Sequence, residues 1–363
     1  MNILVTHRRN DMATYKMLGL LSQNPFFKIY IAVPSEKEEA LVEGSCIPLR
    51  VPPIKSKVCW KLIRELRRYI RQYHIDFIYS QSTAGLSNGL IASWGTKVKN
   101  IGYRDTQAKI KRTDLTHYLA LLNPRVAHIV CETEDIKGYL SRFVDSRKLS
   151  VSVKPFAVEW VSDAYKCPKQ AEGVPDDAFK CIYIGSTKGR PFKGLTFLIK
   201  AFQILNDPVA HLVVIGDYDD SDYELARKGP GGERIHFLGA RTDAINFLPK
   251  QDLFILPALR DASPRVVREA MACGVPCIVT DIPGARDLIV DNESGILVPS
   301  RSPEMIAQAI RTLIGDRDRL KALSVASRER IIRDFSVETC VEYFNKLFSG
   351  FYKEDVETGI KTR

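Results

Sequence analysis

The chain has 363 residues, of which 45% are hydrophobic and 26% are charged, and its formal net charge is +10. This composition is typical of a soluble globular protein, and no apolar run approaches the roughly 20 residues of a membrane span, which excludes a membrane-spanning protein. The length also excludes one small core and favours two domains of roughly 150–200 residues.

The positive charge is confined to the N-terminal half of the chain. Residues 1–158 contain 25 Lys and Arg against 13 Asp and Glu, whereas the remainder contains 28 against 30. This asymmetry predicts an anionic partner for the N-terminal half, namely a membrane surface, a nucleic acid or a phosphorylated substrate.

The cysteines and the first residues indicate the compartment. The eight cysteines are scattered, and the only close pair, Cys273 and Cys277, has no nearby histidine and makes a poor metal site. The start, MNILVTHRR, passes from a strand-like run into basic residues, the reverse of a secretory signal. We therefore expect reduced structural thiols in a cytoplasmic protein.

Strand and helix candidates alternate along the first half of the chain. The apolar runs predict strands at 2–6, 28–33, 75–80, 98–103, 127–131 and 149–153, and the intervening segments predict helices at roughly 12–23, 58–73, 84–94, 114–122 and 133–143.

The segment 55–73, KSKVCWKLIRELRRYIRQY, predicts a helix that is apolar on one face and basic on the other. It contains seven basic residues and a single acid, Glu65, with apolar residues at helical spacing. The apolar face is expected to pack on a sheet. Trp60 and Ile63 add apolar area, and the basic face predicts docking on an anionic membrane surface, where each Lys or Arg contributes about 1 kcal/mol. Nucleic-acid binding is not expected, because no reading motif or aromatic–basic platform is present.

A segment rich in Pro, Gly and charge follows at 154–178, and the alternation then restarts. Strands are predicted at 181–185, 211–216, 235–239, 253–256, 277–280 and 295–298, and helices at roughly 194–205, 264–273, 303–314 and 317–332.

Strands that alternate with crossover helices form parallel sheets covered on both faces. Two such units in tandem predict an α/β protein with two Rossmann-like domains, whose ligands bind in a central cleft at the carboxyl ends of the strands. We place the first domain at 1–158 and the second at 159–334. His7, Arg8 and Arg104 follow strands of the first domain and are candidates for contact with an acceptor.

The most informative stretch is 259–274, LRDASPRVVREAMACG, which follows a strand candidate. Ser263 is a favourable N-cap and Pro264 suits the first helical position, so a helix is predicted to begin there. Gly274 is expected just beyond its C-terminal end.

The start of this helix has the properties of an anion site. Free backbone N–H groups at a helix N-terminus attract phosphate. Arg265, in the first turn, opposes the helix dipole unless an anion is bound. We therefore expect an anionic ligand at this point, flanked by the carboxylates of Asp261 and Glu269.

Several segments resemble, in order and at the usual intervals, the retaining glycosyltransferases of family 4, also called glycosyl transferases group 1, which have the GT-B fold. The similarity extends over about 178–348 and is only architectural before that. Its last part resembles the terminal helices that return to the first domain, here at about 335–352. The segments are 183–202, 211–217, 235–241, 254–298 and 334–348.

The resemblance implies roles for individual residues. Lys193, with Arg190 nearby, would neutralise the diphosphate of a nucleotide-sugar donor, and Glu269 would accept hydrogen bonds from the ribose. Asp261 occupies the first carboxylate position of the family's E-x7-E pattern, close to the transferred sugar. The remaining donor contacts would come from Gly185, from the turn at Gly239 and Arg241 near the base, and from the backbone of Ser263, Pro264, Arg265, Val266 and Val267.

The chain departs from the family pattern at three places. Asp261 stands where members usually have Glu, which shortens the reach by one methylene. Ser186 stands where many have Arg, leaving Arg190 as the substitute. The first strand is followed by 7–10, HRRN, in place of a glycine pair.

Family members usually need no metal, so the resemblance implies no cofactor beyond the UDP- or GDP-sugar. Asp217-Tyr218-Asp219 resembles a metal-binding DxD motif, but we assign it to an acidic loop, DYDDSDYE. A dinucleotide dehydrogenase is disfavoured, because no G-x-G-x-x-G follows a strand.

The sequence thus predicts a cytoplasmic glycosyltransferase that is peripheral on the inner face of the membrane. It would transfer a sugar to a lipid-linked or surface-polysaccharide acceptor. Two alternatives remain: a sugar-nucleotide epimerase of the same fold, and an inactive protein that scaffolds a partner transferase. The replacement of Glu by Asp261 and the missing glycine pair motivate the second.

Overall fold

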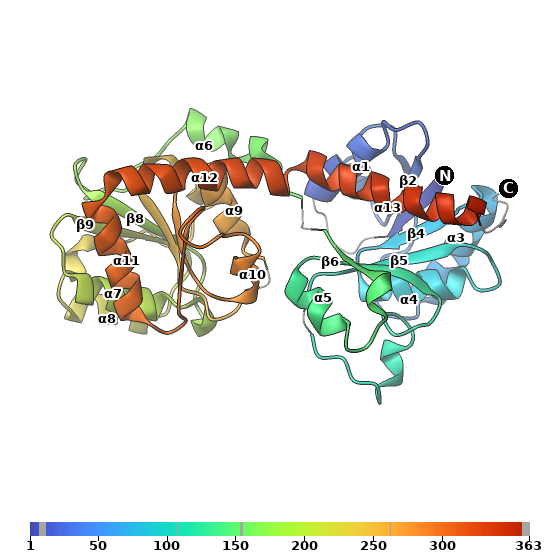
Figure 1. Ribbon diagram of the computed structural model, residues 1–363, viewed down its shortest axis with the longest axis horizontal. Coiled ribbons are helices and arrows are strands. Elements are labelled where there is room, and N and C mark those ends of the chain that lie inside the picture. The colour runs from blue at the N-terminus through green and yellow to red at the C-terminus, as the bar shows by residue number, and fades with distance from the viewer. Residues whose placement is uncertain (7–11, 107, 153–154, 262, 358–363) are drawn as a thin grey trace. The chain divides into compact units, whose positions relative to one another are not determined.

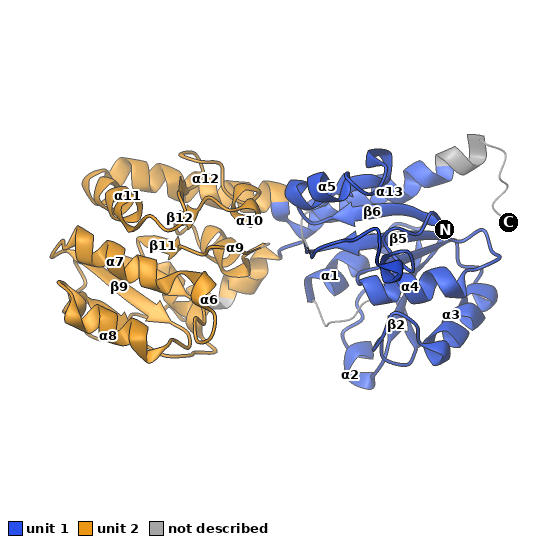
Figure 2. Ribbon diagram, turned by 90° about the horizontal axis from the view of Figure 1, so that it is seen from below, with its two compact units in different colours: residues 1–156, 335–363 blue, residues 157–334 orange. Residues whose placement is uncertain are grey.

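The computed structural model describes residues 1–6, 12–106, 108–152, 155–261 and 263–357. The chain divides into two compact units, which Figure 2 colours separately: unit 1 comprises residues 1–156 and 335–363, and unit 2 comprises residues 157–334. Each unit is built on one parallel sheet, so the predicted α/β class with two parallel sheets is confirmed.

Unit 1 contains a seven-stranded sheet of order β3-β2-β1-β4-β5-β6-β7. Figure 1 labels β2, β4, β5 and β6 of this sheet. The chain leaves β1 toward β2 on one side and returns to β4 on the other, so the order reverses between β1 and β4. The strands are β1 Asn2–Thr6, β2 Lys28–Val33, β3 Ile47–Arg50, β4 Phe77–Ser80, β5 Lys99–Arg104, β6 Val126–Cys131 and β7 Leu149–Val151.

The helices of unit 1 include one from the far end of the chain, α13, which packs on the first-half sheet. The ring of Phe348 in α13 meets those of Phe27 and Phe77 at 6.0 and 5.4 Å. The helices are α1 Met12–Leu21, α2 Glu36–Glu39, α3 Trp60–Gln72, α4 Thr83–Ala92, α5 Glu134–Leu140 and α13 Val337–Glu357, with short 3-10 turns η1 Leu115–His117 and η2 Ser146–Lys148.

Unit 2 contains a six-stranded sheet of order β10-β9-β8-β11-β12-β13. Its central strands are buried on both faces, as continuous apolar runs in parallel sheets are. The strands are β8 Phe179–Ile184, β9 Ala210–Ile215, β10 Ile235–Phe237, β11 Leu253–Leu256, β12 Cys277–Thr280 and β13 Ile296–Val298.

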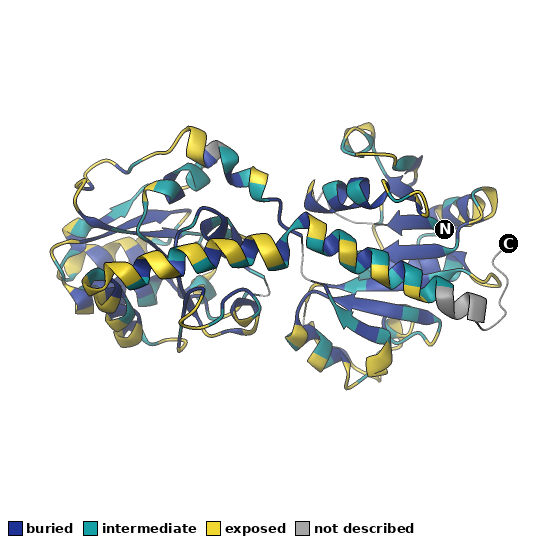
Figure 3. Cartoon of the chain, turned by 45° about the horizontal axis from the view of Figure 1, so that its top comes forward, coloured by how far each residue is buried: buried dark blue, intermediate teal, exposed yellow. Residues whose placement is uncertain are grey.

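The helices of unit 2 cover its sheet, and buried and exposed residues alternate along α12 as they do along α13 (Figure 3). The helices are α6 Ser162–Lys166, α7 Leu195–Leu205, α8 Asp220–Lys228, α9 Arg265–Ala272, α10 Pro283–Arg286, α11 Pro303–Gly315 and α12 Arg317–Phe335, with 3-10 segments η3 Val158–Val161, η4 Pro191–Lys193, η5 Gly232–Arg234 and η6 Ala244–Lys250.

The predicted helix at 114–122 is wrong, because only the turn η1 forms there. The carboxylate of Asp114 accepts from the backbone N–H of Thr116 at 2.9 Å, and the ring of His117 lies 3.1 Å from the carbonyl of Lys111. Polar side chains that bond to nearby backbone groups favour turns over a continued helix.

Strand β3, helix α8 and the short helices α2, α6 and α10 were not predicted. Strand β3 contains Pro48, which is tolerated because β3 lies at the edge of the sheet. The segment from Asp220 onward, expected to be part of an acidic loop, forms helix α8. The acids in its first turn, and Arg227 and Lys228 in its last turn, stabilise this helix through their interaction with the helix dipole.

Candidate functional site

Two loops that carry sequence-predicted donor residues meet where the strand order of unit 2 reverses. The two central strands, β8 and β11, pair with each other. The chain goes from β8 to its other neighbour β9, and from β11 to its other neighbour β12, so the two connections leave in opposite directions. Ligands of open α/β sheets bind at the carboxyl ends of the strands at such a point. The loop after β8 carries Arg190 and Lys193, and the loop after β11 carries Asp261.

The loop after β8 is a series of tight turns. The N–H of Arg190 donates to the carbonyl of Thr187 at 2.6 Å, and the N–H of Lys193 donates to the carbonyl of Arg190 at 3.0 Å. Gly194 then opens α7 with a φ of +81°, and a Cβ at this position would lie 1.9 Å from the carbonyl oxygen of Pro257. Glycine is therefore required where this loop crosses the loop after β11.

The two loops are joined by backbone and side-chain contacts. The N–H of Leu259 donates to the carbonyl of Phe192 at 2.7 Å, and the guanidinium of Arg260 stacks 4.3 Å from the Phe192 ring. The hydroxyl of Thr280, at the end of β12, donates to the carbonyl of Ala258. These bonds hold the two loops together as one surface.

The ammonium of Lys193 meets the carboxylate of Asp261 at 2.7 Å on this surface. Both side chains are mostly buried, with 23% and 18% exposed. Arg190 is exposed, and within the part of the chain that the structure describes its side chain makes no hydrogen bond or ion pair. The site therefore presents one paired and one available cation.

Helix α9 begins at Arg265, one residue later than predicted, and Ser263 is not its N-cap. Pro264 occupies the cap in an extended conformation, with φ −67° and ψ 109°, and its carbonyl accepts from the N–H of Val267 at 3.2 Å. The N–H of Ser263 points instead to the carboxylate of Asp261, at 3.4 Å. The first N–H groups of the helix still lack intrahelical acceptors, as at any helix start.

The predicted C-terminal end of α9 is confirmed. Gly274 has a φ of +67°, its N–H donates to the carbonyl of Met271, and the N–H of Val275 donates to the carbonyl of Ala270. This pair of bonds is the Schellman motif.

Glu269 lies one turn into α9 and is paired with Arg265. The Nε of Arg265 lies 2.8 Å from the Glu269 carboxylate, whose side chain is 16% exposed. Burial raises the pKa of Glu269, and Arg265 partly opposes this shift. The guanidinium of Arg265 also lies 5.8 Å from the Trp160 ring. Arg265, the cation in the first turn of α9, is therefore already paired with Glu269 of the same helix.

The turn after β10 has its own partners. The N–H of Gly216 donates to the carbonyl of Gly239 at 2.9 Å, which ties this turn to the end of β9. Arg241 pairs with Asp243 at 2.8 Å and stacks 5.1 Å from the Phe247 ring. Its guanidinium therefore faces Asp243 rather than Lys193 or Asp261. Gly185, after β8, donates its N–H to Ile215 at 2.8 Å.

Sequence reasoning missed a buried carboxylate beneath the loop after β8. Asp222 of α8 accepts from the hydroxyl of Thr196 at 2.7 Å and, over a longer 3.4 Å, from that of Thr187. Burial, then the nearby Asp222 and Asp261 carboxylates, raises the pKa of Tyr183. Acids in the first turn and bases in the last turn of α8 are the sequence signal that could have placed Asp222 on a helix.

The acceptor candidates of unit 1 are only partly described. His7 and Arg8 lie outside the described residues. Arg104 ends β5, is buried, and donates to the carbonyl of Ala108 at 2.8 Å. Burial lowers its pKa.

No group of three or more His, Cys, Asp or Glu residues is placed to hold a metal ion within the described ranges. Of the DxD-like residues, Asp217 uses its backbone carbonyl to accept from the N–H of Thr187 at 2.7 Å, and Asp219 caps α8 without a side-chain bond.

Comparisons with known proteins agree with this architecture. Residues 168–330 match the family model of glycosyl transferases group 1. A capsular polysaccharide biosynthesis glycosyltransferase, CapM of Staphylococcus aureus, is 30% identical over 45% of this chain and 44% of its own length. A UDP-Gal:alpha-D-GlcNAc-diphosphoundecaprenol alpha-1,3-galactosyltransferase of Escherichia coli is 28% identical over 39% and 37%. The chain thus matches less than half the length of these relatives.

Solved structures match over nearly the whole chain. A glycosyltransferase from Rickettsia africae has a TM-score of 0.79 with 17% identity, covering 97% of this chain and 98% of the other. Anabaena HepE in complex with UDP has a TM-score of 0.77 with 17% identity, covering 96% and 100%. The expected fold is confirmed by these similarities.

Proposed function

We propose that this protein is a retaining glycosyltransferase, because residues 168–330 match the family model of glycosyl transferases group 1. It transfers a sugar from a UDP- or GDP-sugar to a lipid-linked or surface-polysaccharide acceptor. Relatives named for capsular polysaccharide synthesis and for a diphosphoundecaprenol-linked acceptor support this acceptor class.

The observation that carries the proposal is the meeting of Lys193 and Asp261 at 2.7 Å, beside the start of α9. Breaking a glycosyl–phosphate bond sends its electron pair to the departing diphosphate and leaves positive charge on the sugar. A fixed cation on the leaving-group side and a carboxylate on the sugar side stabilise this charge separation.

In this proposal the cations and the helix start bind the diphosphate. Lys193 and the exposed Arg190 contact its oxygens, together with the backbone N–H groups at the start of α9. Asp261 orients the hydroxyls of the transferred sugar, and Glu269 accepts from the ribose. The nucleotide completes the site without a metal, as the family pattern implies.

Binding of the nucleotide-sugar then replaces two ion pairs of the free protein by contacts with the ligand. Lys193 is held by Asp261, and Glu269 is held by Arg265. The diphosphate replaces Asp261 as the main partner of Lys193, which releases the carboxylate toward the sugar. The ribose hydroxyls take the place of Arg265 on Glu269.

The test is transfer or hydrolysis of a nucleotide-sugar by Lys193→Ala and Glu269→Ala, after a thermal-shift screen has identified the nucleotide that stabilises the protein. We expect a loss of kcat/KM of roughly 10²–10³-fold for Lys193→Ala, the range for removing one preorganised charge-stabilising group. Lys188→Ala, an exposed lysine of the same loop, is the control. Unchanged rates in both site variants would contradict the site, and a protein that binds no nucleotide is a scaffold.

We also propose that α3 docks this protein on the inner face of an anionic membrane. The buried residues of α3 form one stripe, and the opposite face exposes Lys61, Arg64, Arg67 and Arg71. Trp60, at its start, is 73% exposed. Basic residues beside an exposed indole suit an anionic bilayer surface. No described helix combines the length and apolar character that crossing a bilayer requires.

Co-sedimentation with phosphatidylglycerol vesicles tests this docking. Lys61→Glu with Arg64→Glu should reduce binding strongly, because each reversal replaces attraction to the lipid by repulsion. Binding should also weaken with salt, since exposed charges are screened over about 10 Å at 0.1 M. The same reversal at Lys188 and Lys200, exposed in unit 2, is the control. Salt-insensitive binding, or equal loss in both pairs, would contradict docking through α3.

A further inference from the structure

Arg104 is a buried cation that has no charged partner among the residues that the structure describes. Its side chain ends β5 and the residue is 8% exposed. One guanidinium nitrogen donates to the carbonyl of Ala108 at 2.8 Å, and its Nε has no hydrogen-bond partner among the described residues. Within the same residues, no carboxylate lies within ion-pair distance of it.

The groups that face Arg104 do not supply the missing anion. The carboxylate of Asp105, the phenol of Tyr139 and the thiol of Cys131 are near enough to influence its charge. Asp105 is exposed, and the thiol of Cys131 is neutral because burial raises its pKa to about 12. The phenol of Tyr139 accepts from the backbone N–H of Ile110 at 2.7 Å. A buried guanidinium without a close anion lowers the stability of a fold, so a ligand that supplies one is the expected partner.

The position of Arg104 is one where ligands bind. It stands at the carboxyl end of β5, beside β4 and one strand from the point where the sheet order of unit 1 reverses. Gly102, two residues earlier on the same face, lies against Leu86 in the first turn of α4. Because side chains two apart share a face of a strand, Arg104 lies toward the N-terminal end of this helix. The first turn of α4 contains no acid.

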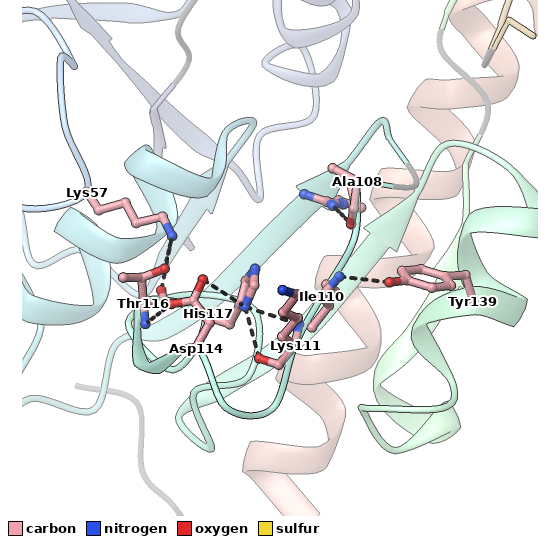
Figure 4. A network of polar contacts seen from close by, with 9 residues as sticks. Lys57, Ala108, Ile110, Lys111, Asp114, Thr116, His117 and Tyr139 are labelled. Atoms are coloured by element: carbon pink, nitrogen blue, oxygen red, sulfur yellow. Dashed lines mark hydrogen bonds and ion pairs between the residues drawn. The ribbon is translucent and has the colours of Figure 1, made fainter.

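The segment that follows Arg104 is held in place by its own contacts and adds further positive charge. Figure 4 shows Ile110 bonded to Tyr139, and Lys57 reaching Thr116, whose hydroxyl accepts from the ammonium at 2.7 Å. The segment also presents three exposed basic side chains, those of Lys109, Lys111 and Arg112. A buried, fork-shaped donor that is followed along the chain by exposed cations suits a phosphate group.

We propose that Arg104 binds a phosphate or diphosphate group of the acceptor, at the carboxyl end of β5. This inference rests on the proposed function and names the acceptor class, a phosphate-linked molecule such as a polyprenyl diphosphate sugar. The guanidinium offers its Nε–H, and the Nη hydrogens that Ala108 does not use, to the phosphate oxygens. The phosphate supplies the anion that Arg104 does not find among the described residues.

Isothermal titration tests the proposal with farnesyl diphosphate, a water-soluble polyprenyl diphosphate, in the presence of saturating UDP or GDP. We expect wild-type protein to bind farnesyl diphosphate and not uncharged farnesol. Arg104→Gln should weaken binding by about tenfold or more, because a charge-assisted bidentate contact is lost. Arg147→Gln is the control and should bind as wild type does, because this exposed arginine pairs with Asp145 and lies just before β7, at the opposite edge of the sheet from Arg104.

Two further measurements separate binding from a structural role. Arg104→Lys keeps the charge and loses the fork, so it should retain part of the affinity. The Tm of ligand-free Arg104→Gln should equal or exceed that of wild type, because the substitution removes a buried unpaired charge. A side chain needed only for folding would give a lower Tm.

The proposal is overturned if Arg104→Gln binds farnesyl diphosphate as tightly as wild type, or if wild type does not bind it. Binding that is lost in Lys193→Ala but kept in Arg104→Gln belongs to the donor site and overturns it as well. A failure of the proposed function is a different result, since nucleotides would then leave the Tm of the wild-type protein unchanged.

Discussion

Lys193 and Asp261 are 68 positions apart in the chain, yet their side chains meet at 2.7 Å. Both residues were predicted as site residues from the family resemblance. Their pairing was not, because spacing along a sequence does not tell which loops of a parallel sheet lie side by side. The pairing follows from the strand order, which places β8 next to β11.

At the same scale, the residues that sequence reasoning missed are supporting ones. Asp222 was assigned to an acidic loop, and Tyr183 was one apolar residue of a predicted strand. Their roles depend on contacts across the fold: Asp222 meets Thr187 and Thr196, which belong to other elements. The residues proposed to contact the ligand lie in a recognisable sequence motif, whereas the residues that support them do not.

Tyr183 gives a residue-scale prediction. Its hydroxyl is buried without a hydrogen-bond partner among the described residues. Because an unsatisfied buried hydroxyl costs about 1–3 kcal/mol, Tyr183→Phe should leave the free energy of unfolding unchanged or raise it. Tyr69→Phe is the matched control, since its hydroxyl donates to the Arg50 carbonyl at 2.8 Å, and it should lose about 0.5–1.5 kcal/mol. Urea unfolding measures both, and a marked loss in Tyr183→Phe contradicts the assignment.

At the scale of elements, the strands were the most predictable part. The run at 253–256 was predicted to the residue, because four consecutive buried apolar residues have few alternatives in an α/β chain. The errors lie where local polar contacts compete with periodicity. Pro48 concealed an edge strand, Asp114 and His117 replaced a helix by turns, and Pro264 took the cap expected of Ser263.

The crossing of the two site loops gives a prediction for a matched glycine pair. Gly189 and Gly194 both have positive φ, but a Cβ at Gly189 meets nothing within 4 Å. Gly189→Ala should therefore lower the free energy of unfolding only by the strain of a left-handed backbone, about 1–2 kcal/mol. Gly194→Ala should cost a further ~1–3 kcal/mol, because its Cβ collides with Pro257 and forces the loops apart.

Denaturant unfolding and nucleotide titration check this pair. Gly194→Ala should also weaken nucleotide binding, since the contact between Lys193 and Asp261 depends on the same crossing. Equal effects of the two substitutions on stability and binding would show that the crossing is not a constraint.

The bond between α7 and α8 gives a second element-scale prediction. Thr196→Val removes a 2.7 Å hydrogen bond to the buried carboxylate of Asp222 and should destabilise the protein by about 1–3 kcal/mol. Thr312→Val is the control, because this exposed hydroxyl bonds only within its own helix, and its effect should stay within ~0.5 kcal/mol. Thermal unfolding at neutral pH distinguishes the two, and equal shifts in Tm contradict the prediction.

At the scale of the whole molecule, histidines in both units predict loss of stability in acid. Burial lowers the pKa of His128 to about 4, and it also lowers the pKa of His211 and of His236. The Nδ1 of His211 lies 3.0 Å from the Nε2 of His236. Unfolded histidines titrate near pH 6.5, so the unfolded chain binds more protons below that pH. The free energy of unfolding should therefore be greatest above about pH 6.5 and fall as the pH drops toward 4.

Urea unfolding at pH 7.5 and pH 5 measures this dependence. His128→Gln should reduce the difference between the two values, because glutamine does not titrate and can still bond to Ser150. His74→Gln serves as the control, since His74 is exposed and should leave the difference unchanged. An identical pH dependence in His128→Gln and wild type would remove His128 as its source.

The return of α13 to the first sheet has a consequence for the order in which the chain acquires its structure. During synthesis residues 1–156 emerge first, but Phe27 and Phe77 cannot pack against Phe348 until it has been made, after all of unit 2. Unit 2 has no such dependence, because it is one uninterrupted stretch of sequence. Unit 1 therefore leaves the exit tunnel before unit 2 but completes its packing after unit 2.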